Sequence, residues 1–131
     1  MAVGDIDQEW AFLVKHGWAV SGVAITKGQL LKPTPGSLSV ANSWDRGGFM
    51  VAMADIASDD EDRKLRVAMD GVVEIQIIHG LPVYFGDRIA IANGGTGQNA
   101  TPTYEDQYVG QAVNYEALTA SGVVPVKLKG W

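Results

Sequence analysis

The chain has 131 residues, of which 47% are hydrophobic and 19% are charged, and its formal net charge is −5 at pH 7. This length predicts a single domain that buries roughly two-thirds of its unfolded surface, and no apolar run resembles a transmembrane helix. The negative charge argues against nucleic acid and against an anionic membrane as the main partner. No cysteine is present, which excludes disulfides, thiolate metal sites and cysteine nucleophiles.

Residues 1–19 lack the pattern of short strands and glycine turns that the rest of the sequence has, and they are predicted to form an N-terminal arm. They contain no basic region followed by an apolar core, so no signal peptide is predicted and synthesis in the cytoplasm is expected. Asp5 or Asp7 could cap a short helix here, but residues 10–14 also fit a short strand. The apolar side chains of the arm either pack on the domain's own core or dock on another chain.

Residues 20–131 have the pattern of a mainly β domain. The 16 glycines favour short strands and tight turns over helices. Alternating or β-branched residues between turn-forming residues predict strands at residues 22–26, 29–32, 37–41, 49–56, 83–85, 87–92, 108–113 and 123–128. Two connections are longer: residues 57–63 are charged, and residues 93–107 are predicted to form a polar loop.

Residues 64–78 carry the clearest strand signature. Their apolar side chains share one parity and their polar side chains dominate the other, as in a strand with one buried face. Asp70-Gly71 interrupts the pattern, and two arrangements keep the apolar residues on one face. One is a hairpin with a three-residue loop at residues 69–71, which sets Arg66 opposite Glu74. The other is a long strand bent at Gly71, as at a barrel corner.

A faint internal repeat predicts two similar β units that close one small barrel or sandwich. Residues 49–71 align with residues 108–130 at a shift of 59, and residues 27–31 align with residues 85–89 at a shift of 58. The shared pattern is a strand pair around glycine, a long loop, a strand that begins with an aromatic residue, and an alternating strand.

No motif predicts catalysis, a metal or a cofactor. The acidic residues Asp55, Asp59, Asp60, Glu61 and Asp62 lack the spacing of a calcium loop and are predicted to form a solvated connection. Residues 94–97 are glycine-rich but lack the lysine and the helix of a phosphate site, so a surface loop is expected. His16 and His79 stand in no catalytic or zinc motif. We therefore expect that the protein is not an enzyme.

Three aromatic residues are the best interface candidates, because they stand in polar loops or at the end of the chain: Trp44, Tyr104 and Trp131. Such side chains are enriched at protein interfaces. They also stack on sugars, so a carbohydrate- or ligand-binding β module is an alternative function.

Several short motifs in the β domain resemble those of the head decoration, or cement, proteins of tailed bacteriophages. FGDRIAI (residues 85–91), YVGQAV (residues 108–113) and VVPVKLKG (residues 123–130) follow one another in the family's order, and RVAMDGVVEI (residues 66–75) echoes it in the first unit. The resemblance covers residues 20–131 and leaves out the arm.

The resemblance implies a non-catalytic protein without a cofactor, made in the host cytoplasm, that sits on the capsid surface of the virion. It implies the major capsid protein as partner, a homotrimer, and no nucleic acid or membrane contact. Its function would be to stabilise the head lattice, and the alternative within the virion is a head fibre or tail-associated protein. The arm would then contact the capsid through Trp10, Phe12, Leu13, Val14 and Trp18.

Overall fold

The structure is a computed structural model that describes residues 2–4, 14–78, 82–99 and 104–129. In these ranges the chain is mainly β, and no helix is long and apolar enough to cross a bilayer. The first five strands are β1 (Val14–Trp18), β2 (Leu30–Thr34), β3 (Ser37–Val40), β4 (Met50–Ala52) and β5 (Lys64–Ala68). The later elements are β6 (Val72–Ile77), β7 (Arg88–Ala92), β8 (Thr96–Gln98), β9 (Tyr108–Ala112), β10 (Gly122–Leu128) and the short 3₁₀ helices η1 (Asn93–Gly95) and η2 (Glu105–Gln107).

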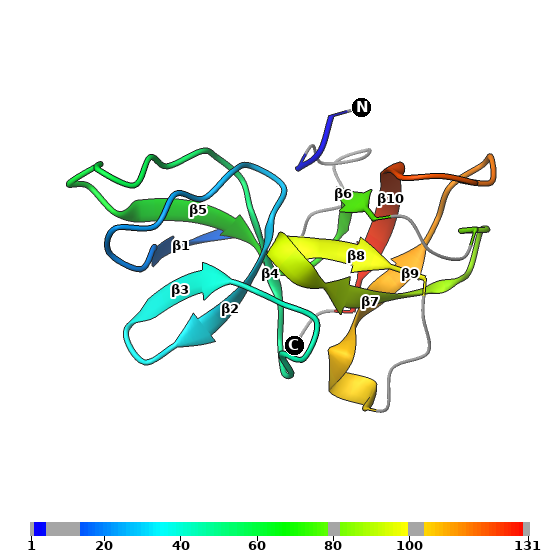
Figure 1. Cartoon of the computed structure of the whole chain (residues 1–131), viewed down its shortest axis with the longest axis horizontal. Helices are drawn as coiled ribbons and strands as arrows, with labels where there is room; N and C mark the ends of the chain where they lie inside the picture. The colour runs from blue at the N-terminus through cyan, green and yellow to red at the C-terminus, as the bar shows by residue number, and fades with distance from the viewer. Residues whose placement is uncertain (1, 5–13, 79–81, 100–103, 130–131) are drawn as a thin grey trace.

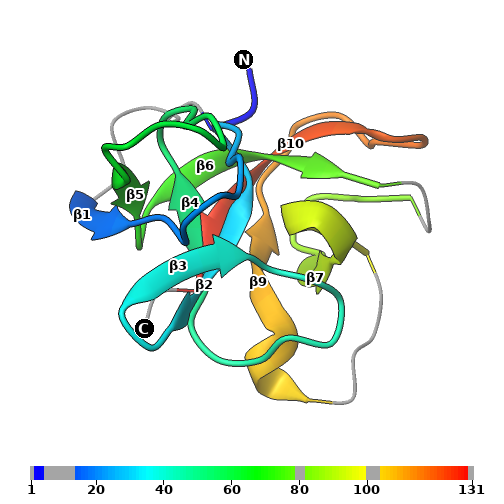
Figure 2. The same ribbon diagram turned by 60° about the vertical axis from the view of Figure 1, so that its left-hand side comes forward.

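The strands form two bodies that lie side by side (Figures 1 and 2). Strands β1 to β5, here called unit 1 (residues 14–68), make an open sheet in the order β1-β5-β4-β2-β3. Strands β6 to β10, here called unit 2 (residues 72–128), make a closed barrel in the order β10-β6-β8-β7-β9. The predicted mainly β fold with a small barrel and two similar units is confirmed. The barrel, however, is closed by unit 2 alone and not by the two units together.

The two units repeat one topology. Read around the barrel from β6 through β10, the strand order of unit 2 is the order of unit 1 with each strand replaced by its counterpart five strands later. The parallel pair Ala19–Leu38 of unit 1 corresponds to Ile77–Gly97 of unit 2, at shifts of 58 and 59 residues. Gly28 and Gly86, also 58 apart, have φ angles of 92° and 91°, which favour glycine at both equivalent turns.

Strand β4 matches β9 at a shift of 60 instead of the predicted 59. Val51 pairs with Leu30 in unit 1, and Gln111 pairs with Arg88 in unit 2, which sets this shift. The additional residue of unit 2 is absorbed by the register shift between Ile89 and Ala90. This irregularity explains why a gapless alignment of the two halves is one residue out of register at β4.

The chain passes from one body to the other at residues 69–71, so the predicted hairpin is wrong. Strand β5 pairs with β1 and β4, whereas β6 pairs with β10 and β8. The alternative, a bend at Gly71, is closer: Gly71 has a φ of 98°, and its carbonyl accepts the N–H of Leu128 at 2.7 Å. Glu74, which the alternation predicts on a polar face, is only 5% exposed.

Each unit has its own core, and one of the two cores also joins the units. Unit 1 is filled by apolar residues that include Leu31, Leu65 and Val67. The barrel core of unit 2 extends into unit 1, since Leu30, Val51 and Ala68, each 0% exposed, belong to the same cluster as the barrel residues. The opposite faces of β2 therefore serve two different cores.

Several predicted elements differ in length from those observed. Residues 22–26 and 83–85 contribute single bridges, at Ile25 and Val83, and β4 ends before the predicted strand 49–56 does. The predicted polar loop at residues 93–107 contains β8, which closes the barrel. Gly97 of β8 is buried, and a Cβ added to it would lie 2.7 Å from Ile89 and 3.0 Å from Ile77. Here glycine makes room for neighbouring core side chains.

Candidate interaction surface

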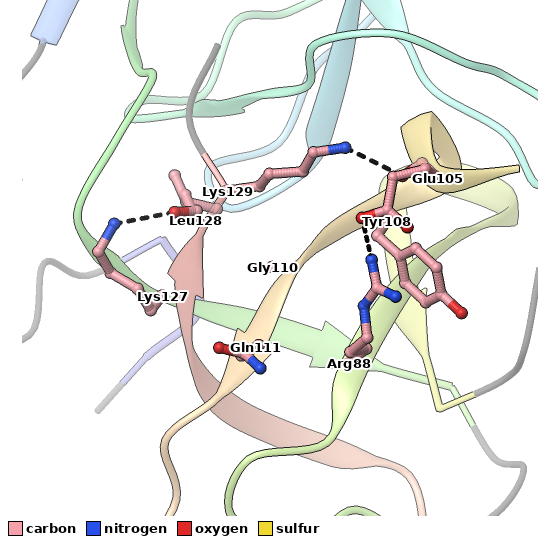
Figure 3. Close-up of a pocket in the computed structure, with 8 residues that line it drawn as sticks. All are labelled: Arg88, Glu105, Tyr108, Gly110, Gln111, Lys127, Leu128 and Lys129. Atoms are coloured by element: carbon pink, nitrogen blue, oxygen red, sulfur yellow. Dashed lines mark hydrogen bonds and ion pairs between the residues drawn. The ribbon is translucent and has the colours of Figure 1, made fainter.

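A cationic pocket lies on the outer face of the barrel, over β7, β9 and β10 (Figure 3). Its centre is a row of three residues in register across these strands: Arg88 pairs with Gln111, and Gln111 pairs with Lys127. The pocket has a volume of about 270 Å³ and is lined by Arg88, Glu105, Tyr108, Gly110, Gln111, Lys127, Leu128 and Lys129. Three cationic side chains and one carboxylate thus line a single hollow.

The backbone at Gly110 shapes the pocket floor. A Cβ at this position would lie 2.0 Å from the carbonyl oxygen of Lys127. No side chain fits without separating β9 from β10, so the close approach of the two strands requires glycine.

The cations of the pocket are held in fixed positions. The Arg88 guanidinium stacks 3.6 Å from the centroid of the Tyr108 ring and pairs with the carboxylate of Glu105. Lys129 Nζ donates to the carbonyl of Glu105 at 2.9 Å. Lys127 Nζ donates to Asp70 Oδ1 at 2.8 Å, and this bond, together with the N–H of Gly71, lowers the pKa of the Asp70 carboxyl.

A second surface, with aromatic side chains, shares η2 with the pocket: Glu105 of η2 lines the pocket, and the neighbouring Asp106 contacts the second surface. Arg46 lies 3.7 Å from the centroid of the Tyr104 ring, and its Nε donates to Asp106 at 2.8 Å. Trp44, on the same loop as Arg46, is 80% exposed, and Tyr104 is 46% exposed. The structure therefore brings the loops of two predicted interface aromatics, Trp44 and Tyr104, together. The third, Trp131, lies outside the described residues.

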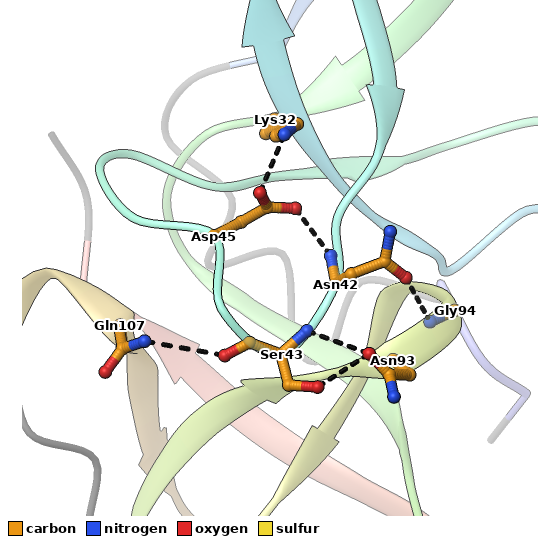
Figure 4. Close-up of polar contacts among 7 residues, drawn as sticks. All are labelled: Lys32, Asn42, Ser43, Asp45, Asn93, Gly94 and Gln107. Carbon is orange, nitrogen blue, oxygen red and sulfur yellow. Dashed lines mark hydrogen bonds and ion pairs between the residues drawn. The ribbon is translucent and has the colours of Figure 1, made fainter.

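The loop that carries Trp44 is anchored to both units (Figure 4). Asp45 accepts the Nζ of Lys32 at 2.7 Å and the N–H of Asn42 at 2.7 Å. Burial raises the pKa of Asp45, but these two hydrogen bonds outweigh that effect and lower it overall. Asn93 Oδ1 of unit 2 accepts the N–H of Ser43 at 3.1 Å and its hydroxyl at 2.6 Å.

The predicted arm residues are only partly described. Trp10, Phe12 and Leu13 lie outside the described residues. Val14 begins β1, which pairs with β5 along its whole length, and Trp18 ends β1 with its side chain 57% exposed. Strand β1 is the counterpart of β6 and belongs to the sheet of unit 1.

The sequence motifs that were considered as candidate metal, phosphate or catalytic sites can now be placed in the structure. Among the described residues, no group of three or more histidine, aspartate or glutamate side chains could hold a metal ion. The acidic residues from Asp59 to Asp62 are exposed in the connection between β4 and β5, as predicted. Gly94 and Gly95 form a turn against unit 1, where Gly95 donates its N–H to the carbonyl of Ala41 at 2.8 Å. His79 lies outside the described residues.

Sequence reasoning missed the cationic row and a second group of exposed aromatics. Arg88, Gln111 and Lys127 are far apart in sequence, and only the pairing of three strands aligns them. The exposed aromatics are Tyr84, Phe85 and Tyr115, which is 95% exposed. The bridge between Val83 and Leu118 joins their two segments. Alternation on predicted strands could have flagged the row only after the strand order was known.

The fold is similar to that of the head fibre gp8.5 N base of bacteriophage phi29. The two chains share 19% identity, with a TM-score of 0.59 over 89% of this chain and 95% of that chain. No family model matches this chain, and no curated protein matches its sequence. The similarity establishes a shared fold over nearly the whole of both chains.

Proposed function

We propose that this protein is a non-catalytic structural component of a phage virion, which binds the outer surface of the head as a decoration protein. The observation that carries the proposal is the shared fold with a head fibre base, which extends over nearly the whole of both chains. The motifs at residues 85–91, 108–113 and 123–130, which resemble those of head decoration proteins, point independently to the same part of the virion.

The proposed action is stabilisation by mass action. A protein that binds the assembled lattice better than free capsid subunits lowers the free energy of the assembled state. If the copies assemble as the expected homotrimers, the several contacts that each trimer makes with the lattice add avidity to modest single contacts. A surface with exposed aromatic and arginine side chains, such as Trp44 beside Arg46, has the composition of protein interfaces.

The proposed contact with the major capsid protein is the N-terminal segment, through Trp10, Phe12, Leu13, Val14 and Trp18. A deletion that tests it should end at residue 13, because β1 pairs with β5 and its loss would open the sheet of unit 1. Removal of residues 1–13 is expected to abolish head binding and to leave the β signature in circular dichroism unchanged. Head binding that survives in the folded variant would refute this role of the segment.

The experiment that tests the proposed function is co-sedimentation with purified heads of the phage that encodes the protein. We expect saturable binding at a fixed number of copies per capsomer, and heads that resist heat or chaotrope better when occupied. Light scattering on the free protein tests the trimer separately. Absence of binding to mature heads, under conditions in which the protein is folded, would overturn the proposal.

A head fibre base is the second candidate, and it is favoured by the identity of the structural neighbour. Electron microscopy of occupied heads distinguishes the two: a decoration protein gives a compact layer over the lattice, whereas a fibre base lies beneath a projecting fibre. The exposed aromatics Trp44 and Tyr104 also suit a carbohydrate-binding module, which a glycan array tests directly.

A further inference from the structure

The cationic pocket occupies the face of unit 2 that, in unit 1, packs against the neighbouring unit. The row Arg88–Gln111–Lys127 of unit 2 is the counterpart of the row Leu30–Val51–Ala68 of unit 1, because the same strands pair in the same register. The unit 1 row is apolar, 0% exposed and part of the cluster that includes the barrel core.

The same face of unit 2 has the opposite character. All three residues of its row are exposed, and two of them are cationic. With Lys129, the pocket brings together three of the ten lysine and arginine residues of a chain whose net charge is −5. The face that accepts an apolar neighbour in unit 1 is therefore cationic in unit 2: three cations line the pocket against the single carboxylate of Glu105, and Lys127 is paired with Asp70 at its edge. An anionic neighbour is the partner that complements this excess.

The chain itself carries a segment of complementary charge. Residues 59–62 place three aspartates and a glutamate in succession, all exposed, in the connection between β4 and β5. In Figure 1 this green connection turns at the end of unit 1 that lies away from the barrel. The segment and the pocket therefore lie in different units, with the acidic turn at a far end of the molecule.

The acidic segment is also held in one conformation. Asp60 accepts the N–H of Ala57 at 2.9 Å, and Asp62 accepts the N–H of Lys64 at 3.0 Å. Arg63 donates to the carbonyls of Ala57 at 2.5 Å and Val20 at 2.8 Å. A turn fixed in this way loses little conformational entropy when it docks.

We propose that the acidic segment (residues 59–62) of one copy docks in the cationic pocket of a second copy, so that copies associate head to tail. Such a contact is heterologous, and it closes into a ring when the rotation between copies allows it. The inference deepens the proposed homotrimer, on which it rests, by naming the two surfaces that meet. It does not depend on head binding.

Charge reversal tests the contact. In the pocket, Gln111→Glu with Lys129→Glu inverts the charge and spares the pair between Lys127 and Asp70. In the segment, Asp59→Lys with Glu61→Lys reverses two of its four carboxylates, takes its charge from −4 to 0, and spares the turn bonds of Asp60 and Asp62. We expect each pair to weaken self-association, measured by sedimentation equilibrium, by at least about tenfold. A chain with all four changes should associate more tightly than either of the two paired variants, because the two lysines introduced in the segment then meet the two glutamates introduced in the pocket.

The control has Arg66→Glu with Thr119→Glu, which changes the net charge as much as the pocket variant does, at exposed positions outside both the pocket and the acidic segment. We expect the control to associate like the wild type. Three results would overturn the proposal. They are a wild type that stays monomeric up to millimolar concentration, a reversal of one surface that leaves association unchanged, or a chain with all four changes that associates no better than the paired variants. If the wild type is a trimer and the charge reversals do not change its association, this contact is refuted while the trimer stands. Head binding, assayed separately by co-sedimentation, then decides the proposed function.

Discussion

Leu30→Ala is the sharpest test of how the two units are joined. Leu30 is 0% exposed and belongs to the cluster that includes the barrel core, although it lies on a strand of unit 1. Truncation of a buried leucine to alanine costs about 2–5 kcal/mol, as lost burial plus a residual cavity. That is a large share of a total stability on the order of 5–15 kcal/mol. Urea unfolding followed by circular dichroism gives the value.

The matched control is Leu31→Ala. Leu31 is also 0% exposed, but it belongs to the separate core of unit 1. We expect a similar loss of global stability from both variants and a different location of the damage. In native-state hydrogen exchange, Leu30→Ala should accelerate the amides of β7 and β9, whereas Leu31→Ala should accelerate mainly those of unit 1.

Two results would refute this reasoning. A cost below about 1 kcal/mol for Leu30→Ala would mean that the contact between the units contributes little. Equal acceleration of the barrel amides in both variants would mean that the two cores unfold as one cooperative unit.

Three further variants test the barrel, the crossing between the units and the loop anchor. Gly110→Ala should lower the stability measured by thermal unfolding by about 1–3 kcal/mol or more, since its Cβ would lie 2.0 Å from a carbonyl oxygen. Its control is Gly36→Ala, which meets no neighbouring atom but has a φ of 79°, and which should cost about 1 kcal/mol. An equal loss of stability in the two variants would contradict the proposed clash at Gly110. Asp70 has a lowered folded-state pKa, so its stabilisation is present above the unfolded pKa of about 4 and is lost as pH falls through the folded value. Asp70→Asn should therefore reduce the difference in urea midpoint between pH 7 and pH 3, and an unchanged difference would remove Asp70 as a source. Asn93→Ala removes the acceptor for Ser43 and should cost about 1 kcal/mol, with faster amide exchange at residues 42–48; unchanged exchange there would mean that other bonds hold the loop.

The β class, most strand positions and the presence of two similar units could be predicted from the amino-acid sequence. These features are local: alternation at Leu65 and Val67 reports a half-buried strand, and the spacing of Gly28 and Gly86 reports equivalent turns. The exposure of Trp44 and of the acidic connection could also be predicted, because both stand among polar residues.

The pairing of the strands could not be predicted in this way, and it became known with the three-dimensional structure. Residues 64–78 fit a hairpin as well as a bend, because both place Leu65, Val73 and their neighbours on one face. The choice depends on pairing of β5 with β1 and of β6 with β10, over separations that no local pattern records. The same pairing makes a pocket from Arg88, Gln111 and Lys127, and it hides Leu30 of β2 in the core shared with the barrel. Strand register is set by long-range packing, and the chemistry of this surface therefore appears only once the sheets are closed.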